Sequence, residues 1–109
     1  MSFDMNKLMQ QAVEMQKQVE QMQADAEKEI GESSVGGGMV KVTANGAGEV
    51  LAIEISRDAI DPDDPETLAD LVLAGVNEAL RSAQAAVEAK AQQMQSELFG
   101  GLGLPGLEP

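Results

Sequence analysis

The chain lacks histidine, cysteine, tryptophan and tyrosine, and its only aromatic residues are two phenylalanines. Without cysteine there is no disulfide, and without histidine and cysteine there is no zinc cluster and no Ser-His or Cys-His pair. Without tyrosine or tryptophan there is no stacking platform for single-stranded nucleic acid. We therefore expect no enzyme activity, no catalytic or metal-binding residues and no small-molecule substrate.

Positive charge is also scarce. Seven lysine and arginine residues face nineteen acidic residues, and the net charge is −12. A field of this sign repels phosphate backbones and anionic lipid at long range, so any binding of double-stranded DNA is expected to be weak and salt-sensitive. The hydrophobic content of 43% suffices for a core, and the 109 residues predict one domain over residues 1–99.

Long apolar runs are the third absence. No stretch approaches the ~20 apolar residues that span a bilayer. Residues 1–20 contain no continuous apolar run of the kind found in secretory signal peptides. These patterns predict a cytoplasmic protein without a membrane partner.

A heptad pattern runs from Met5 to Ala26 and predicts a helix of about 26 residues, with Ser2 or Asp4 as its cap. Lysines at positions 7, 17 and 28 each follow an acidic residue by three positions, which predicts three ion pairs along this helix. The heptad seam can be core packed against another helix, or a methionine-rich surface for a partner protein. The seam consists of Met5, Leu8, Ala12, Met15, Val19, Met22 and Ala26.

Residues 39–55 alternate between apolar and polar side chains, which predicts a β-hairpin. The turn is expected at Asn45-Gly46-Ala47-Gly48, where the glycines would supply positive φ angles. The register that places the apolar side chains on one face sets Val42 opposite Leu51 and Val40 opposite Ile53. The second strand contributes Leu51, Ile53 and Ile55 to that face, and residues 27–33 can add a third strand.

An acidic loop leads into a second long helix that ends at residue 99. Asp63 is the predicted cap, with Pro65 in the first turn and Glu66 at the third position. The aspartates of the loop do not fit a calcium loop, because the glycine and glutamate positions of that motif hold Glu66 and Val72. Residues 100–109, rich in Gly, Leu and Pro, are predicted to form a flexible tail. The Gly-x-Gly-x-x-Gly match at 101–106 follows a helix rather than a strand, which argues against a dinucleotide site.

Helices of these lengths would extend roughly 40 and 50 Å at 1.5 Å per residue. A compact domain of this size has a radius of gyration near ~13 Å. The projecting apolar stripes and the edges of a small sheet then require cover that one chain cannot provide. We therefore expect a homodimer. Its dimer or core contacts are predicted at Val40, Val42, Leu51, Ile53, Ile55, Met15, Val19 and Met22.

The whole pattern resembles the YbaB/EbfC family of nucleoid-associated proteins. Within "GGGMVKVTANGAGEV", the most specific pieces are Gly38 followed by Val40-Lys41-Val42-Thr43 and Asn45-Gly46. The others are the helix start from Glu66 to Asn77 and Leu104-Pro105-Gly106. The resemblance implies an α+β fold with a long N-terminal helix, a small antiparallel sheet of two or three strands and a long C-terminal helix. It also implies a tweezers-like homodimer that binds double-stranded DNA in the nucleoid and affects nucleoid organisation and gene expression, without a cofactor.

Two functional hypotheses follow. If the helices hold DNA, cations and amides on them must reach phosphates or base edges. The candidates for these DNA contacts are Lys7, Lys17, Arg81, Lys90, Gln10, Gln11 and Gln16. The alternative is a dimeric adaptor whose methionine-rich helical arms bind another protein through Met5, Met9, Met15 and Met22.

Overall fold

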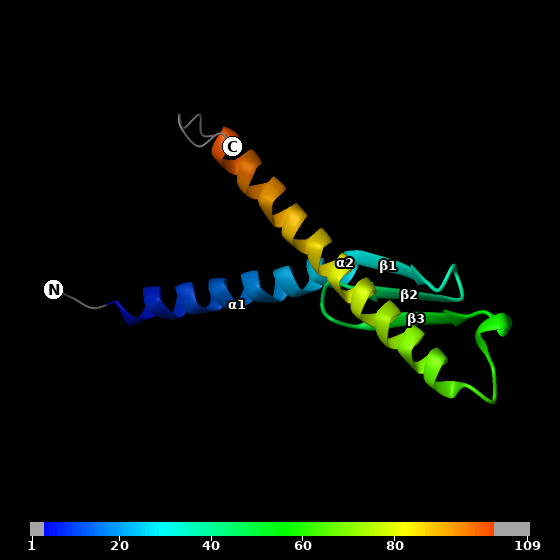
Figure 1. Ribbon diagram of the computed structural model, residues 1–109. Coiled ribbons are helices and arrows are strands. Elements are labelled where there is room, and N and C mark those ends of the chain that lie inside the picture. The colour runs from blue at the N-terminus through cyan, green and yellow to red at the C-terminus, as the bar shows by residue number, and fades with distance from the viewer. Residues whose placement is uncertain (1–3, 102–109) are drawn as a thin grey trace.

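The computed structural model describes residues 4–101. It has the α+β architecture that the sequence predicts, with two long helices around a small sheet (Figure 1). The additional strand predicted at residues 27–33 is present as the first strand of the sheet, and it begins three residues later than expected. In chain order the elements are α1 (Met5–Lys28), β1 (Ile30–Val35), β2 (Val40–Asn45), β3 (Val50–Ile55), the short 3-10 helix η1 (Arg57–Ala59) and α2 (Pro65–Gly101).

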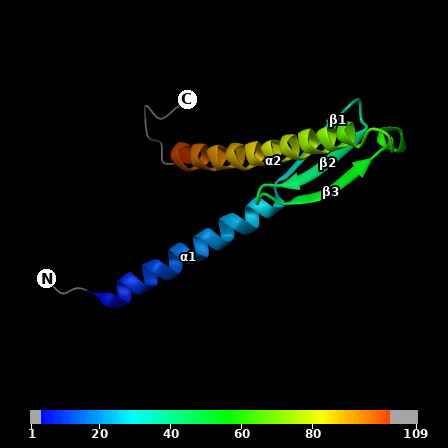
Figure 2. The same cartoon turned by 60° about the horizontal axis from the view of Figure 1, so that its bottom comes forward.

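The sheet is antiparallel in the order β1-β2-β3, and the first half of α2 lies across β1 and β2 (Figures 1 and 2). Small residues allow this close approach. A Cβ atom on Gly31 would lie only 2.5 Å from the carbonyl oxygen of Ala79. The buried Ser33 hydroxyl donates a hydrogen bond of 2.6 Å to the carbonyl oxygen of Gly75. The helix backbone therefore rests almost directly on β1, and it seals the buried side chains of β2.

The predicted hairpin register is wrong by two residues along β3. Val42 pairs with Ile53 and Val40 with Ile55, whereas Leu51 has no partner because a bulge interrupts the ladder between Thr43 and Ala44. Residues directly opposite each other in an antiparallel sheet project from the same face. Ile53 and Ile55 therefore lie on the face that α2 covers over β2. Yet they remain 44% and 40% exposed, because α2 makes little contact with β3.

The turn explains the shift in register. The Asn45 side-chain oxygen accepts hydrogen bonds from the backbone amides of Ala47 and Glu49, each at 3.1 Å. The backbone amide of Asn45 donates to the carbonyl oxygen of Glu49 at 2.9 Å, which closes the loop at that pair. Only Gly48 has the positive φ angle expected of both turn glycines, at 86°. The alternation rule alone contains no information about this side-chain-built turn.

Both helices begin at aspartate caps. Asp4 accepts a hydrogen bond from the amide of Lys7, whereas the other candidate, Ser2, lies outside the described residues. The cap of α2 is Asp64 and not Asp63, because Pro65 is the first helical residue and Asp64 accepts from the amide of Thr67. The helix continues through Gly101, two residues beyond the predicted end. From residue 102 onwards, the predicted tail lies outside the described part of the chain.

The two helices project from the same end of the sheet and diverge (Figures 1 and 2). We call α1 and residues 88–101 of α2 the arms, and residues 29–87 the hub. No residue of α1 is buried, and residues 88–100 are all exposed. The radius of gyration is 21.1 Å, far above the ~13 Å of a compact domain of this size. Within residues 4–101, no helix combines the length and apolar character that crossing a bilayer requires.

Candidate nucleic-acid interface

The negative charge of the chain is concentrated in the hub. Residues 29–87 contain eleven acidic and three basic residues, a net charge of −8. By contrast, α1 contains four acids and three lysines, and residues 88–101 contain two acids and one lysine. Much of the hub charge lies in the loop at 57–66, at the end of the sheet away from the arms (Figure 1). The arms are therefore close to neutral, and the net charge of −12 does not describe their surface.

Helical geometry separates the residues of α1 into two faces. Lys7, Lys17 and Lys28 follow each other at spacings of ten and eleven residues, close to the 10.8 residues of three helical turns. They therefore share one side of the helix, about 16 Å apart along the axis, and Gln10 lies on the same side. We call these four residues the lysine face. The apolar heptad seam occupies the opposite side, so both surfaces can be used at once.

The ion pairs predicted along α1 do not form. Among residues 4–101, none of the three lysines of α1 has a carboxylate oxygen within 4 Å. The carboxylate of Asp4 caps the helix instead, and that of Asp25 accepts a hydrogen bond of 3.0 Å from the amide of Gln21. Glu14 lies beside the lysine face without contacting an ammonium group. The exposed lysines are consequently available to an external anion.

The seven predicted DNA contacts do not lie on one surface. Lys7, Gln10 and Lys17 share the lysine face of α1, whereas Gln11 and Gln16 flank the apolar seam. Arg81 is exposed on the outer side of α2 over the sheet, since the helix faces the sheet with Ala79 and Ala83. Lys90 is held in an ion pair with Glu29 at 3.0 Å. Lys28 is absent from the predicted set, although the three-turn spacing in the sequence could have identified it.

The predicted dimer and core residues also divide into two groups. Val40 and Val42 are fully buried beneath α2. The others are exposed in the single chain, from 40% for Ile55 to 70% for Met22. These exposed side chains are Leu51, Ile53 and Ile55 on β3 and Met15, Val19 and Met22 on the seam of α1.

Residues 4–101 contain no cluster of three acidic side chains that could hold a metal ion. The model of the YbaB/EbfC DNA-binding family matches residues 1–98 of the sequence, which includes both the lysine face and the sheet. The chain belongs to the YbaB/EbfC DNA-binding family. That family is described by DNA binding and not by a catalysed reaction.

Relatives in the YbaB/EbfC family are similar over nearly their whole length. The chain is 47% identical to a nucleoid-associated protein of Thermoanaerobacter pseudethanolicus, over 96% of this chain and 91% of that protein. It is 43% identical to a nucleoid-associated protein of Pelotomaculum thermopropionicum, over 98% of both chains. The crystal structure of the uncharacterized protein HP0035 from Helicobacter pylori has the same fold, with a TM-score of 0.62 and 24% identity. That match covers 90% of this chain and 99% of HP0035.

Proposed function

We propose that the protein is a nucleoid-associated homodimer that binds double-stranded DNA through the lysine faces of its α1 arms. Membership of a DNA-binding family supports the DNA partner, and the names of the relatives support a location in the cytoplasmic nucleoid. The observation that supports DNA binding by the arms is the separation of charge, with a net charge of −8 on the hub and −1 on α1. Through its occupancy of DNA, the dimer contributes to nucleoid organisation and affects gene expression.

The open edge of the sheet supports the homodimer. Among residues 4–101, β3 pairs with β2 on one side only, so its outer backbone groups have no partner strand there. Its apolar side chains Ile53 and Ile55 lie beside the covered part of the sheet but outside the reach of α2. An edge of this kind promotes pairing with another chain unless it is protected. A second copy of the chain would cover both the edge and the exposed side chains.

Light scattering at micromolar concentration tests the homodimer. We expect a mass near twice the 11.4 kDa of the chain. A mass near 11.4 kDa over the whole concentration range would contradict the dimer.

Fluorescence anisotropy with labelled duplex DNA tests the DNA partner. We expect binding at 20 mM salt that depends little on sequence and is largely lost near physiological salt. The slope of log affinity against log salt should correspond to about 3–5 phosphates per dimer at ~0.9 each. Replacing Lys7, Lys17 and Lys28 by Gln should abolish this binding. Replacing the three hub cations Lys41, Arg57 and Arg81 by Gln changes the net charge by the same amount. This control variant should retain most of the DNA binding.

The second candidate function is the dimeric adaptor, and the exposure of the α1 seam favours it. Met5, Met9, Met15 and Met22 are all more than 60% exposed in the single chain. Flexible methionine side chains adapt to different apolar partners. If wild-type protein fails to bind long duplex DNA in excess at 20 mM salt, the adaptor replaces DNA binding as the proposed function.

A further inference from the structure

The direction of the α1 arm is determined at its base. Of the 24 residues of α1, Asp25 and Ala26 are half-buried, and the others are exposed. The part of α1 before Asp25 is a lever of about 30 Å at 1.5 Å per residue. A rotation of ~10° at the base would move its tip by ~5 Å. The few contacts at the base therefore control where the lysine face lies.

The first of these contacts is made by Gly46, in the turn between β2 and β3. Its backbone amide donates hydrogen bonds to the carbonyl oxygens of both Ala26 and Glu29, each at 2.9 Å. A Cβ atom at this position would overlap the side chain of Val87 on α2 and would lie 2.7 Å from the carbonyl oxygen of Ala26. The φ angle of Gly46 is not positive, so close packing and not backbone strain requires glycine here. The turn thus lies between the last turn of α1 and α2 and is close to both.

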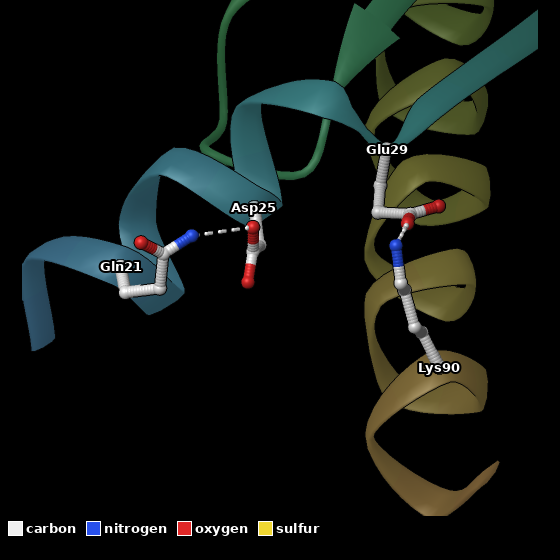
Figure 3. A network of polar contacts seen from close by, with 4 residues as sticks. All are labelled: Gln21, Asp25, Glu29 and Lys90. Atoms are coloured by element: carbon white, nitrogen blue, oxygen red, sulfur yellow. Dashed lines mark hydrogen bonds and ion pairs between the residues drawn. The ribbon is translucent and has the colours of Figure 1, made fainter. Parts of the chain in front are cut away.

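The second contact is an ion pair between Glu29, directly after α1, and Lys90 on the α2 arm (Figure 3). The ammonium group of Lys90, on α2, lies 3.0 Å from a carboxylate oxygen of Glu29, the residue that follows α1. The hydrogen bond to Glu29, its charge and the nearby charge of Asp25 raise the pKa of Lys90 above its ordinary value. Asp25 is itself oriented by the side-chain amide of Gln21. Glu29 therefore pairs directly with the cation of α2, and the charge of Asp25 acts on it from a greater distance.

We propose that Gly46 and the Glu29–Lys90 ion pair are positioning residues that set the direction of the α1 arm relative to α2. Gly46 fixes the pivot, because its amide donates a hydrogen bond to the last turn of α1. Since it has no side chain, it also leaves room for the side chain of Val87. The ion pair restrains rotation about that pivot. The consequence for DNA rests on the proposed function, whereas the positioning itself does not. On this basis, Lys90 contributes to DNA binding by orienting the lysine face and not by contacting a phosphate.

Distances between two spin labels test the positioning without DNA. The chain has no cysteine, so labels at Glu20→Cys on α1 and Gln92→Cys on α2 are specific. Mixing labelled chains with an excess of unlabelled chains isolates the distance within one chain. We expect a narrow distance distribution for the otherwise unchanged protein. Lys90→Glu should shift it to longer distances and broaden it, because three carboxylates would then meet at the base.

Reversal of both charges in Glu29→Lys/Lys90→Glu should restore the narrow distribution, and Lys90→Arg should preserve it. Gly46→Ala should displace the distribution even with the ion pair intact. If Gly46→Ala does not fold, as judged by circular dichroism, the charge variants still decide the matter. Unchanged distances in Lys90→Glu, or no recovery in the double variant, would overturn the proposal. The proposed function fails separately, if the wild-type protein does not bind duplex DNA.

Discussion

Asp64 shows how one side chain fixes the start of the long helix α2. Its carboxylate accepts hydrogen bonds from the hydroxyl of Thr67 at 2.6 Å and from the backbone amide of the same residue at 3.2 Å. Both bonds favour the charged form and lower the pKa of Asp64 below its ordinary value of 3.8. The neighbouring Asp63 lies one position too early, and its own amide donates to Asp61. The sequence could not separate these adjacent aspartates, since both match the capping pattern.

We predict that Asp64→Ala lowers the thermal midpoint at pH 7 and that Asp63→Ala leaves it nearly unchanged. A carboxylate with a lowered pKa in the folded state stabilises that state above its unfolded pKa. This contribution is lost as the pH falls through the folded pKa. The difference between wild type and Asp64→Ala should therefore be constant from pH 7 to 5 and shrink below pH 3.8. Equal midpoints for the two variants at pH 7, measured by circular dichroism, would contradict the assignment of the cap.

At the scale of an element, α1 combines an apolar seam with a lysine face on its opposite side. Both patterns are present in the sequence, and the helix itself was predictable from the heptads. The hairpin was predictable as an element but not in its register, because the bulge and the Asn45 turn depend on specific hydrogen bonds. The Glu29–Lys90 ion pair was not predictable either, because it joins residues far apart in the sequence and depends on where α2 crosses the sheet.

Glu14 gives a prediction about the lysine face. Its carboxylate lies beside Lys7 and Lys17 and would repel a phosphate that approaches them. Glu14→Gln should therefore strengthen duplex binding at 20 mM salt, by roughly threefold to tenfold for two arms. Glu78→Gln makes the same change of charge on the hub, at an exposed position of α2, and should have a smaller effect. Equal strengthening in both variants, measured by anisotropy, would show that only the net charge matters.

At the scale of the whole molecule, the sequence predicted an elongated chain that needs a second copy, and the structure shows the elongation. The sequence alone did not reveal how the charge is divided between hub and arms, because this division depends on which residues fold into the hub. A net charge of −12 predicted weak DNA binding for the chain as a whole. The nearly neutral arms now explain how an acidic protein can still approach a phosphate backbone.

Val42 and Ile53 form one cross-strand pair but should respond differently to aspartate. Val42 is 1% exposed, so Val42→Asp would bury an unpaired carboxylate at a cost of several kcal/mol and should prevent folding. Ile53 is 44% exposed in one chain, so Ile53→Asp should keep the helical circular dichroism signal. In the dimer, the charge would meet the second copy, and light scattering should show a monomer with weakened DNA binding. A dimeric Ile53→Asp variant would exclude β3 from the interface.

The most direct measurement moves a single lysine around α1. Lys17→Gln/Gln10→Lys keeps the cation on the lysine face, and Lys17→Gln/Gln16→Lys transfers it to the edge of the seam. The two variants have the same composition, and in each the new lysine precedes a glutamate by four residues. In salt titrations of duplex binding, the first should retain the wild-type slope. The second should lose about 0.9 per arm, or ~1.8 per dimer. Identical slopes for the two variants would contradict the binding of DNA on the lysine face of α1.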